Sequence, residues 1–397
     1  MQKIFEKVKY LTGNFEVLKN MPNVPALPLF SDSALNFLNE LSEKLLFSKV
    51  AREYPDIAAY AFWIRRAYTE KIRKRYDDGT QRLGWGVAFH ITPSNIPVQF
   101  AVSMTYALTA GNASVIRVSD KEFPQVDIIC RAIREVIRDK CPEIFPYICI
   151  IRYGHDDAVT EKLSAMCDVR MIWGGDGTIS RIRKFPVRPR CIDIGFADRY
   201  SIAVIDSEAY LKLNPEETAN DFYNDTYFSD QNACSAARII VWLGEKISEA
   251  KKIFWSNLEK LVEKKYRIGE IAGSEKLLKT ALCAANHPGI KEIRKNNFTV
   301  RVELPELYED IMEYKGNSGY FFEYNADNIE EIIPLFKKEC QTVTFIGEFE
   351  DELRSLIRKH GVRGVDRIVR VGHGSDLAFV WDGLDLPHTL SRQTGNI

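Results

Sequence analysis

Short apolar runs that alternate with helical patterns constrain the fold of this chain most strongly. Residues 86–91, 114–118, 147–153 and 169–173 are apolar runs of strand length. Between the second and third runs, residues 124–140 repeat apolar side chains at helical spacing. Strands that alternate with helices in this way are typical of a parallel sheet covered on both faces. The sequence therefore predicts an α/β fold.

The second half of the chain predicts another α/β unit with its own sheet. Its expected helices cover residues 245–265 and 275–285, and its expected strands are 298–302, 342–346 and 367–371. The sequence contains no internal repeat and no Gly/Ser linker between the two halves.

The domain boundary is placed after an apolar strand that ends near Asp206. This gives a first domain over residues 1–206, which begins with helices, and a second domain over 207–375. A last segment, 376–397, is expected to return to the first domain or to form an oligomer interface.

Composition excludes several classes of protein. The 397 residues are 45% hydrophobic and 27% charged, with a formal net charge of −1, so binding to nucleic acid is not expected. No apolar run approaches the roughly 18 residues of a membrane-spanning helix, and the N-terminus lacks a secretory core, so we expect a cytoplasmic protein without a transmembrane segment. The eight cysteines include no C-x-x-C pair, so no metal site is expected.

Loops that follow predicted strands supply the first candidate site residues. The carboxyl ends of parallel strands form the edge where such sheets bind ligands. In Thr-Pro-Ser-Asn-Ile-Pro at 92–97, two prolines stiffen a turn and direct the amide of Asn95. Such an amide can stabilise an oxyanion. The alternative is a turn in which Asn95 satisfies its own backbone.

Two further loops suit a nucleotide. Arg117 lies at the end of the strand that follows Gly111 and Asn112, where an arginine can hold a ribose or a phosphate. Trp-Gly-Gly-Asp-Gly-Thr at 173–178 is a glycine-rich turn from strand to helix, which could bring backbone N–H groups close to a pyrophosphate. The turn lacks the G-x-G-x-x-G spacing.

Cys234 is the candidate nucleophile. It lies in Gln-Asn-Ala-Cys-Ser at 231–235, a turn of small residues before the apolar run 238–242. Backbone N–H groups of such a turn can face the sulfur and a bound carbonyl group. The alternative is an inert, buried thiol.

Taken together, these segments resemble the motif series of the aldehyde dehydrogenase superfamily. The most similar branch is the acyl-CoA reductases of the bacterial luminescence fatty-acid reductase (LuxC) family. The ordered segments that carry the resemblance are 92–95, 110–117, 173–175, 192–195, 231–234, 340–343, 364–367 and 381–383. The resemblance implies an aldehyde-dehydrogenase-like fold, with a Rossmann-type cofactor domain followed by a catalytic cysteine domain.

The resemblance also implies catalytic roles. Cys234 would accept the acyl group, and Asn95 would donate to the oxyanion together with the Cys234 backbone N–H. Asp193 falls near the general-base glutamate of the superfamily, in a segment that departs from the usual Glu-Leu-Gly-Gly. A shorter carboxylate there would favour reduction over hydrolysis, although Asp193 could equally be a structural cap.

The cofactor implied by the resemblance is NADPH, with NADH possible. Its expected contacts are Thr92, Pro93, Arg117, Gly174 and Gly175. Arg117 stands where the superfamily usually has a lysine that contacts the adenosine ribose or its phosphate.

The implied activity is NAD(P)H-dependent reduction of an acyl thioester to an aldehyde through an S-acyl cysteine. The donor would be acyl-CoA or an acyl-carrier thioester. A homo-oligomer and an acyl-protein synthetase partner are further expectations from the family. The alternatives are an acyl-phosphate reductase resembling glutamate-semialdehyde dehydrogenase, and a non-catalytic scaffold for the synthetase.

Three features stay open at this level. The basic segment 181–190 could hold a phosphate or be a solvated loop. His90 could assist protonation or be a core residue. His373 and Asp376 could face the cleft or cap a turn.

Overall fold

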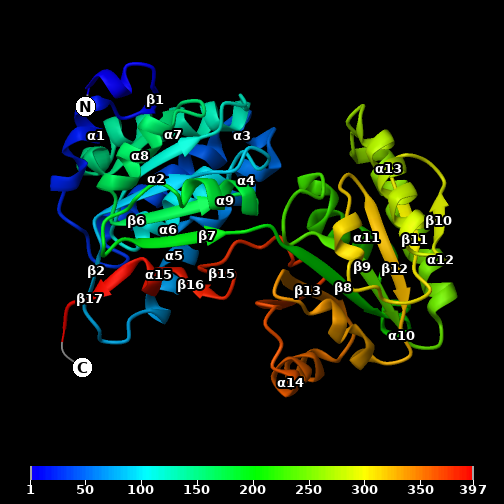
Figure 1. Ribbon diagram of the computed structural model, residues 1–397. Coiled ribbons are helices and arrows are strands. Elements are labelled where there is room, and N and C mark those ends of the chain that lie inside the picture. The colour runs from blue at the N-terminus through cyan, green and yellow to red at the C-terminus, as the bar shows by residue number, and fades with distance from the viewer. Residues whose placement is uncertain (1, 396–397) are drawn as a thin grey trace. The chain divides into compact units, whose positions relative to one another are not determined.

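The computed structural model describes residues 2–395 and divides into two compact units (Figure 1). Unit 1 comprises Met1–Ala197 and Leu377–Ile397, and unit 2 comprises Asp198–Asp376. Each unit is an α/β layer structure built on its own sheet, as the sequence predicts.

The sheet of unit 1 has the strand order β1-β5-β4-β3-β6-β7. All neighbouring strands are parallel except β1, which pairs antiparallel with β5. The strands are β1 (Lys9–Thr12), β3 (Val87–Ile91), β4 (Ala113–Val118), β5 (Ile148–Arg152), β6 (Val169–Trp173) and β7 (Ile192–Phe196). The edge strand β1 was not predicted from the sequence.

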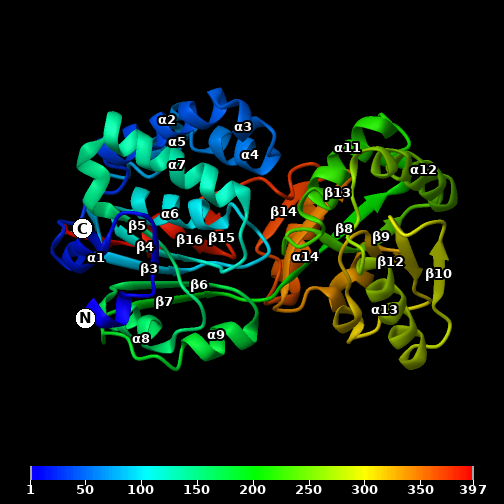
Figure 2. The same ribbon diagram turned by 90° about the horizontal axis from the view of Figure 1, so that it is seen from above.

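Helices cover both faces of this sheet. Figure 2 shows α2 and α7 on one side and α8 and α9 on the other. The apolar stripe of α7 is buried, which explains why this segment forms a helix against the sheet. The main helices are α2 (Asp32–Phe47), α4 (Pro55–Trp63), α5 (Arg66–Arg75), α6 (Gln99–Thr109), α7 (Pro124–Asp139), α8 (Asp157–Met166) and α9 (Asp176–Ile182).

The C-terminal segment packs into unit 1. Its strand β17 (Ser391–Gln393) pairs antiparallel with β2 (Arg82–Gly84). Phe379, Leu386 and Leu390 are buried in the core of unit 1. The segment therefore completes the first unit although it follows the second in sequence.

The sheet of unit 2 has the order β10-β11-β12-β9-β8-β13-β14, in which only β10 is antiparallel to its neighbour. Its strands are β8 (Tyr200–Asp206), β9 (Ala237–Leu243), β10 (Lys291–Arg294), β11 (Val300–Glu303), β12 (Tyr320–Asn325), β13 (Cys340–Ile346) and β14 (Arg367–Arg370). Its longer helices are α11 (Pro215–Asp225), α12 (Ile247–Lys265), α13 (Ala272–Asn286) and α14 (Glu350–His360). Side chains on the two faces of the sheet form separate apolar clusters.

The observed boundary differs from the expected one at Asp206. Strand β8 pairs with β9 and β13 in the second sheet, so unit 2 already begins at Asp198. Because β8 is buried on both faces like the strands of the first sheet, its sequence does not reveal which sheet it joins. Within the described residues, no helix is long and apolar enough to cross a membrane.

Candidate functional site

The carboxyl edge of the first sheet brings six of the predicted residues together. Thr92, Pro93 and Asn95 follow β3, Arg117 lies near the end of β4, and Gly174 with Gly175 follows β6. Since β4, β3 and β6 are adjacent and parallel, their carboxyl ends meet at one edge. We call this set of six residues the ligand edge.

Hydrogen bonds fix Thr92 and Arg117 at the ligand edge. The backbone N–H and hydroxyl of Thr92 donate to the carbonyl of Arg117 at 3.2 and 2.9 Å. The Arg117 guanidinium donates to the carbonyl of Tyr153 at 3.3 Å and lies 5.3 Å from the centre of the Tyr153 ring. The Arg117 side chain is therefore held across the ends of β4 and β5, with its charge at the ligand edge.

Asn95 is exposed in the turn between Pro93 and Pro97. Among the described residues, its side-chain amide makes no hydrogen bond, so the alternative of a turn satisfied by Asn95 itself is not what the structure shows. The amide is therefore available to a ligand of unit 1.

The glycine-rich turn leaves space beside its backbone. Gly175 precedes α9, with an ordinary φ of −66°, and a Cβ atom added there meets nothing within 4 Å. Neither backbone conformation nor packing within the protein requires glycine at this position. The space beside Gly175 is therefore open to a ligand of unit 1.

Asp193 does not lie at the ligand edge. It is the second residue of β7 and pairs in register with Arg170, the second residue of β6, which places it toward the opposite end of the sheet. Its carboxylate accepts two hydrogen bonds from the buried Arg170 guanidinium, at 2.6 and 3.3 Å. This geometry does not support the expected general base and favours the structural alternative. Arg170 also donates to the carbonyls of Ile182 and Phe185, so the ion pair anchors the chain after α9.

The structure shows the surroundings of two of the open features. His90 is fully buried, shares a hydrogen bond of 2.7 Å with Ser103, and has a pKa that burial lowers to about 3. It is therefore a neutral core residue. In the basic segment, Arg188 pairs with Asp168 at 3.1 Å and Arg181 with Asp157 at 3.5 Å, within unit 1.

Cys234 lies in the turn before β9, in unit 2. The Ser201 hydroxyl donates to the Cys234 carbonyl at 2.7 Å, and the Gln341 side-chain amide donates to its Sγ at 3.1 Å. Ser201 comes from β8 and Gln341 from β13. Both the backbone and the sulfur of Cys234 are thus positioned by strands distant in sequence.

Gln231 holds the same turn from the other side. Its buried side chain donates to the carbonyls of Ala237 and Tyr320 and accepts from the N–H groups of Gly319 and Tyr320, at 2.9 to 3.0 Å. These bonds attach the turn to the start of β12. Gln231 itself has a left-handed φ of 57°. We call residues 230–236 the cysteine turn.

The accessibility of the thiols distinguishes Cys234 from most other cysteines. Cys234 and Cys191 are partly exposed, whereas the other six are buried. Burial raises the pKa of Cys130 and of Cys149 to about 12, which keeps these thiols protonated. The sulfur of Cys191 lies 3.8 Å from that of Cys167, and this contact lowers its pKa.

The loop 372–376 of unit 2 is held by a buried carboxylate. Asp225 accepts hydrogen bonds from the N–H groups of Gly372, Gly374 and Ser375, at 2.7 to 3.3 Å. Burial outweighs these bonds and raises the pKa of Asp225 to about 6. The exposed His373 pairs with Asp376 at 2.8 Å, so this loop is a capped turn.

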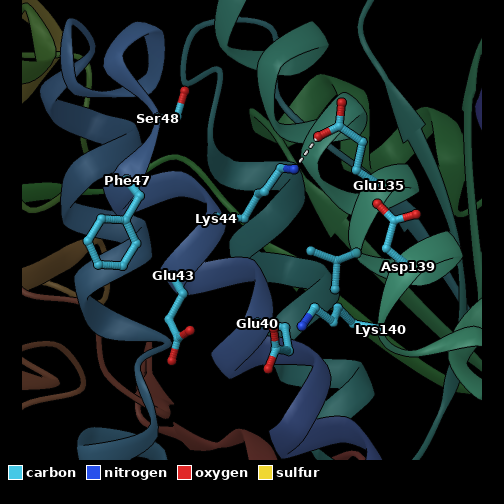
Figure 3. Close-up of a pocket in the computed structure, with 9 residues that line it drawn as sticks. Glu40, Glu43, Lys44, Phe47, Ser48, Glu135, Asp139 and Lys140 are labelled. Carbon is cyan, nitrogen blue, oxygen red and sulfur yellow. Dashed lines mark ion pairs between the residues drawn. The ribbon is translucent and has the colours of Figure 1, made fainter.

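A cavity of about 580 Å³ lies on the surface between α2 and α7 (Figure 3). Its lining mixes charges of both signs, including the pair of Lys44 and Glu135 at 2.6 Å. No residue of the ligand edge contributes to it. Among the described residues, no cluster of three potential metal ligands occurs.

Comparison with known proteins identifies the family to which this chain belongs. The profile of the acyl-CoA reductase (LuxC) family matches residues 23–284. The chain belongs to this family, which confirms the resemblance found in the sequence motifs.

Two curated relatives carry the same description. The long-chain acyl-protein thioester reductase of Vibrio harveyi is 24% identical over 295 residues, and that of Photorhabdus laumondii is 23% identical over 305 residues. Each alignment covers 72% of this chain and 58% of the relative. The chain thus matches little more than half the length of these relatives.

Solved structures confirm the aldehyde-dehydrogenase-like fold. An NAD-dependent benzaldehyde dehydrogenase from Corynebacterium glutamicum aligns with a TM-score of 0.65 and 13% identity, over 94% of this chain and 86% of that chain. An NADP-dependent enzyme of Escherichia coli aligns with a TM-score of 0.65 and 13% identity, over 95% and 87%.

Three residues that position candidate site residues were not assigned roles from the sequence. Gln341 lies in a motif that the sequence singles out, but nothing local indicates that its amide reaches Cys234, 107 positions away. Ser201 and Arg170 stand in ordinary apolar strands. A polar residue within such a strand is the only signal they give, because it must find a partner when buried.

Proposed function

We propose that this chain reduces an acyl thioester to an aldehyde through an S-acyl intermediate on Cys234, with a nicotinamide cofactor as hydride donor. The setting of Cys234 is the observation that carries the proposal. The residue is partly exposed and its turn is fixed by Ser201 and Gln231, as a nucleophile that must be both accessible and oriented requires. Membership of the acyl-CoA reductase family supports the same reaction.

The proposed chemistry begins at the sulfur. The Cys234 thiolate attacks the thioester carbonyl carbon, a new C–S bond forms, and the original thiol leaves and takes up a proton. When bound, the cofactor supplies a hydride to the acyl carbon. The resulting oxyanion is stabilised by N–H donors, for which we propose the Asn95 amide and the Cys234 backbone. Its collapse breaks the C–S bond, releases the aldehyde and regenerates the thiolate.

The proposed cofactor contacts are Thr92, Pro93, Arg117, Gly174 and Gly175. The open space beside Gly175 and the fixed charge of Arg117 support a dinucleotide at the ligand edge. The structural neighbours include both an NAD-dependent and an NADP-dependent enzyme. We propose NADPH, because the Arg117 guanidinium suits a 2′-phosphate.

The proposed substrate is a long-chain acyl thioester, either acyl-CoA or an acyl group carried on a protein. The relatives described as long-chain acyl-protein thioester reductases support this choice. We further propose that the chain forms a homo-oligomer and receives acyl groups from an acyl-protein synthetase.

The test follows NADPH oxidation with acyl-CoA esters from short to long chains, with NADH and an acyl phosphate in parallel. Wild-type protein should oxidise NADPH with a thioester, and Cys234→Ala should lose at least about a thousandfold of this activity because no acyl-enzyme forms. Turnover with the acyl phosphate and with none of the thioesters would show that the acyl donor is an acyl phosphate. Turnover retained in Cys234→Ala would exclude the proposed intermediate.

A further inference from the structure

Two irregularities in strand pairing converge on Cys234. Between β8 and β13, the register shifts between Cys340 and Val343, so that Gln341 and Thr342 both stand opposite Ser201. Between β8 and β9, the register shifts just after Ser201, and the extra residue is Arg238. Both pairs are parallel, where bulges are rare, and bulges beside active sites redirect side chains.

The first bulge directs two groups toward the cysteine turn. The Thr342 N–H donates to the Ser201 hydroxyl at 3.1 Å, and Ser201 in turn donates to the Cys234 carbonyl. The neighbouring Gln341 is buried and donates to the Cys234 sulfur at 3.1 Å. Regular pairing would place only one residue opposite Ser201, so the bulge allows both contacts to form at once.

The second bulge places a buried cation near the same sulfur. Arg238 donates to the Gly316 carbonyl and to the Asn317 side-chain oxygen, both at 2.6 Å, and neither partner carries a charge. Burial lowers the pKa of Arg238 to about 10, while the nearby Asp198, Cys234 and Asp230 act in the opposite direction. The guanidinium would therefore attract a negative charge on the Cys234 sulfur.

Two acidic groups near Arg238 have partners within unit 2. Lys315 pairs with Asp198 at 3.0 Å, and the Tyr266 hydroxyl donates to Asp230.

We propose that Gln341 is a positioning residue that orients the Cys234 sulfur and favours its ionised form for attack on the acyl group. This role rests on the proposed nucleophile. A hydrogen bond donated to an anion is stronger than one to a neutral group, so the Gln341 amide favours the thiolate over the thiol. The amide N–H is too weakly acidic to transfer its proton to the sulfur.

The experiment measures the rate of iodoacetamide alkylation of Cys234 against pH, with the modified peptide quantified by mass spectrometry. Because alkylation needs neither substrate nor cofactor, it tests Gln341 even if the proposed reductase activity is not found. Gln341→Leu should raise the pH midpoint of alkylation by about one to two units, as expected for loss of a hydrogen bond to a charged group.

Gln341→Glu keeps the shape of the side chain but places a carboxylate beside the sulfur. It should raise the midpoint at least as far as Gln341→Leu, and it carries the test if the leucine variant fails to fold. Thr344→Val is the matched control, since Thr344 is buried on the same strand and its hydroxyl bonds to the Ile202 carbonyl. It should keep the wild-type midpoint.

An unchanged midpoint in Gln341→Glu would overturn the proposal. An equal shift in Thr344→Val would also overturn it, because the effect would then come from packing of β13 and not from the Gln341 amide. Shifts in both Gln341 variants with a normal control would establish the positioning role.

Discussion

Asn95 at the ligand edge of unit 1 and Cys234 in the cysteine turn of unit 2 are held in place in opposite ways. At the ligand edge, Asn95 is exposed and Gly175 borders open space. In the cysteine turn, the backbone and the sulfur of Cys234 are both hydrogen-bonded, and Gln231 is fully buried. Asn95 is placed by its local turn, whereas Cys234 is placed by contacts with distant strands.

Because of this difference, removal of the Asn95 side chain in unit 1 should affect ligand binding alone, whereas removal of a side chain that holds the cysteine turn in unit 2 should also affect stability. Removal of an exposed side chain that makes no hydrogen bond within the protein changes only the interactions of the protein with a ligand. Removing a buried side chain that satisfies several backbone groups leaves those groups without partners, at a cost of about 1–3 kcal/mol each. Each of the following predictions tests one side of this comparison.

The largest expected effect is that of Gln231→Ala. Four backbone hydrogen bonds of its side chain disappear in a buried environment, so the free energy of unfolding should fall by about 3–5 kcal/mol. Chemical denaturation followed by fluorescence measures this change. Gln99→Ala is the control, since Gln99 is also buried but its amide makes no hydrogen bond among the described residues. The loss in free energy of unfolding in Gln99→Ala should be less than half as large. Equal losses in the two variants would contradict a stabilising role for the hydrogen bonds of Gln231.

The same contrast explains which parts of the molecule could be predicted from the sequence. The fold class and most strands followed from runs such as 86–91 and 169–173, because apolar periodicity is a local property. The ligand edge could be predicted as a group because the ends of neighbouring parallel strands must meet. The sequence did not predict which sheet contains β8, because the apolar run of this strand fits either sheet.

The surroundings of Cys234 depend on register, which the sequence does not display. The contact with Gln341 requires a bulge in β13, and the bulge depends on how three strands align. Asp193 illustrates the reverse problem. Its motif position suggested catalysis, but its partner Arg170, 23 positions earlier, fixes it in an ion pair. Motif order alone cannot show where a carboxylate points.

A smaller effect, confined to activity, is expected for Asn95→Ala. Loss of one oxyanion donor should lower kcat by about a hundredfold to a thousandfold, while the free energy of unfolding changes by less than about 0.5 kcal/mol. Steady-state kinetics and denaturation on the same preparations measure both. Ser94→Ala, at the exposed neighbouring position, should leave both unchanged. A destabilised Asn95→Ala protein would show that the ligand edge also depends on its side chains.

The pH dependence of stability tests how the ionisation of Asp225, which holds the loop 372–376, affects the stability of unit 2. The folded-state pKa of Asp225 is raised from 3.8 to about 6, so the folded protein holds this proton at a pH where the unfolded chain has released it. The contribution of this group to stability is therefore full below about pH 4 and is lost as pH rises through about 6, amounting to up to about 3 kcal/mol.

Asp225→Asn should accordingly flatten this part of the profile. Unfolding free energies of wild type and variant, measured between pH 4 and 7, should show the smaller decline in the variant. A parallel decline in both proteins would mean that the loop 372–376 does not depend on the ionisation of Asp225.

The smallest expected effects distinguish two glycines of the same turn. Added Cβ atoms at Gly175 and Gly177 both meet nothing within 4 Å. Gly177 lies inside α9, so Gly177→Ala should stabilise the protein by about 0.4–1 kcal/mol through the unfolded chain and leave NADPH binding unchanged. Gly175 precedes the helix at the ligand edge, so Gly175→Ala should be nearly neutral for stability but weaken NADPH binding about tenfold, because its methyl group occupies the space proposed for the cofactor. Fluorescence titration with NADPH measures the difference in affinity. Equal affinities of the two variants would show that the cofactor does not lie against Gly175.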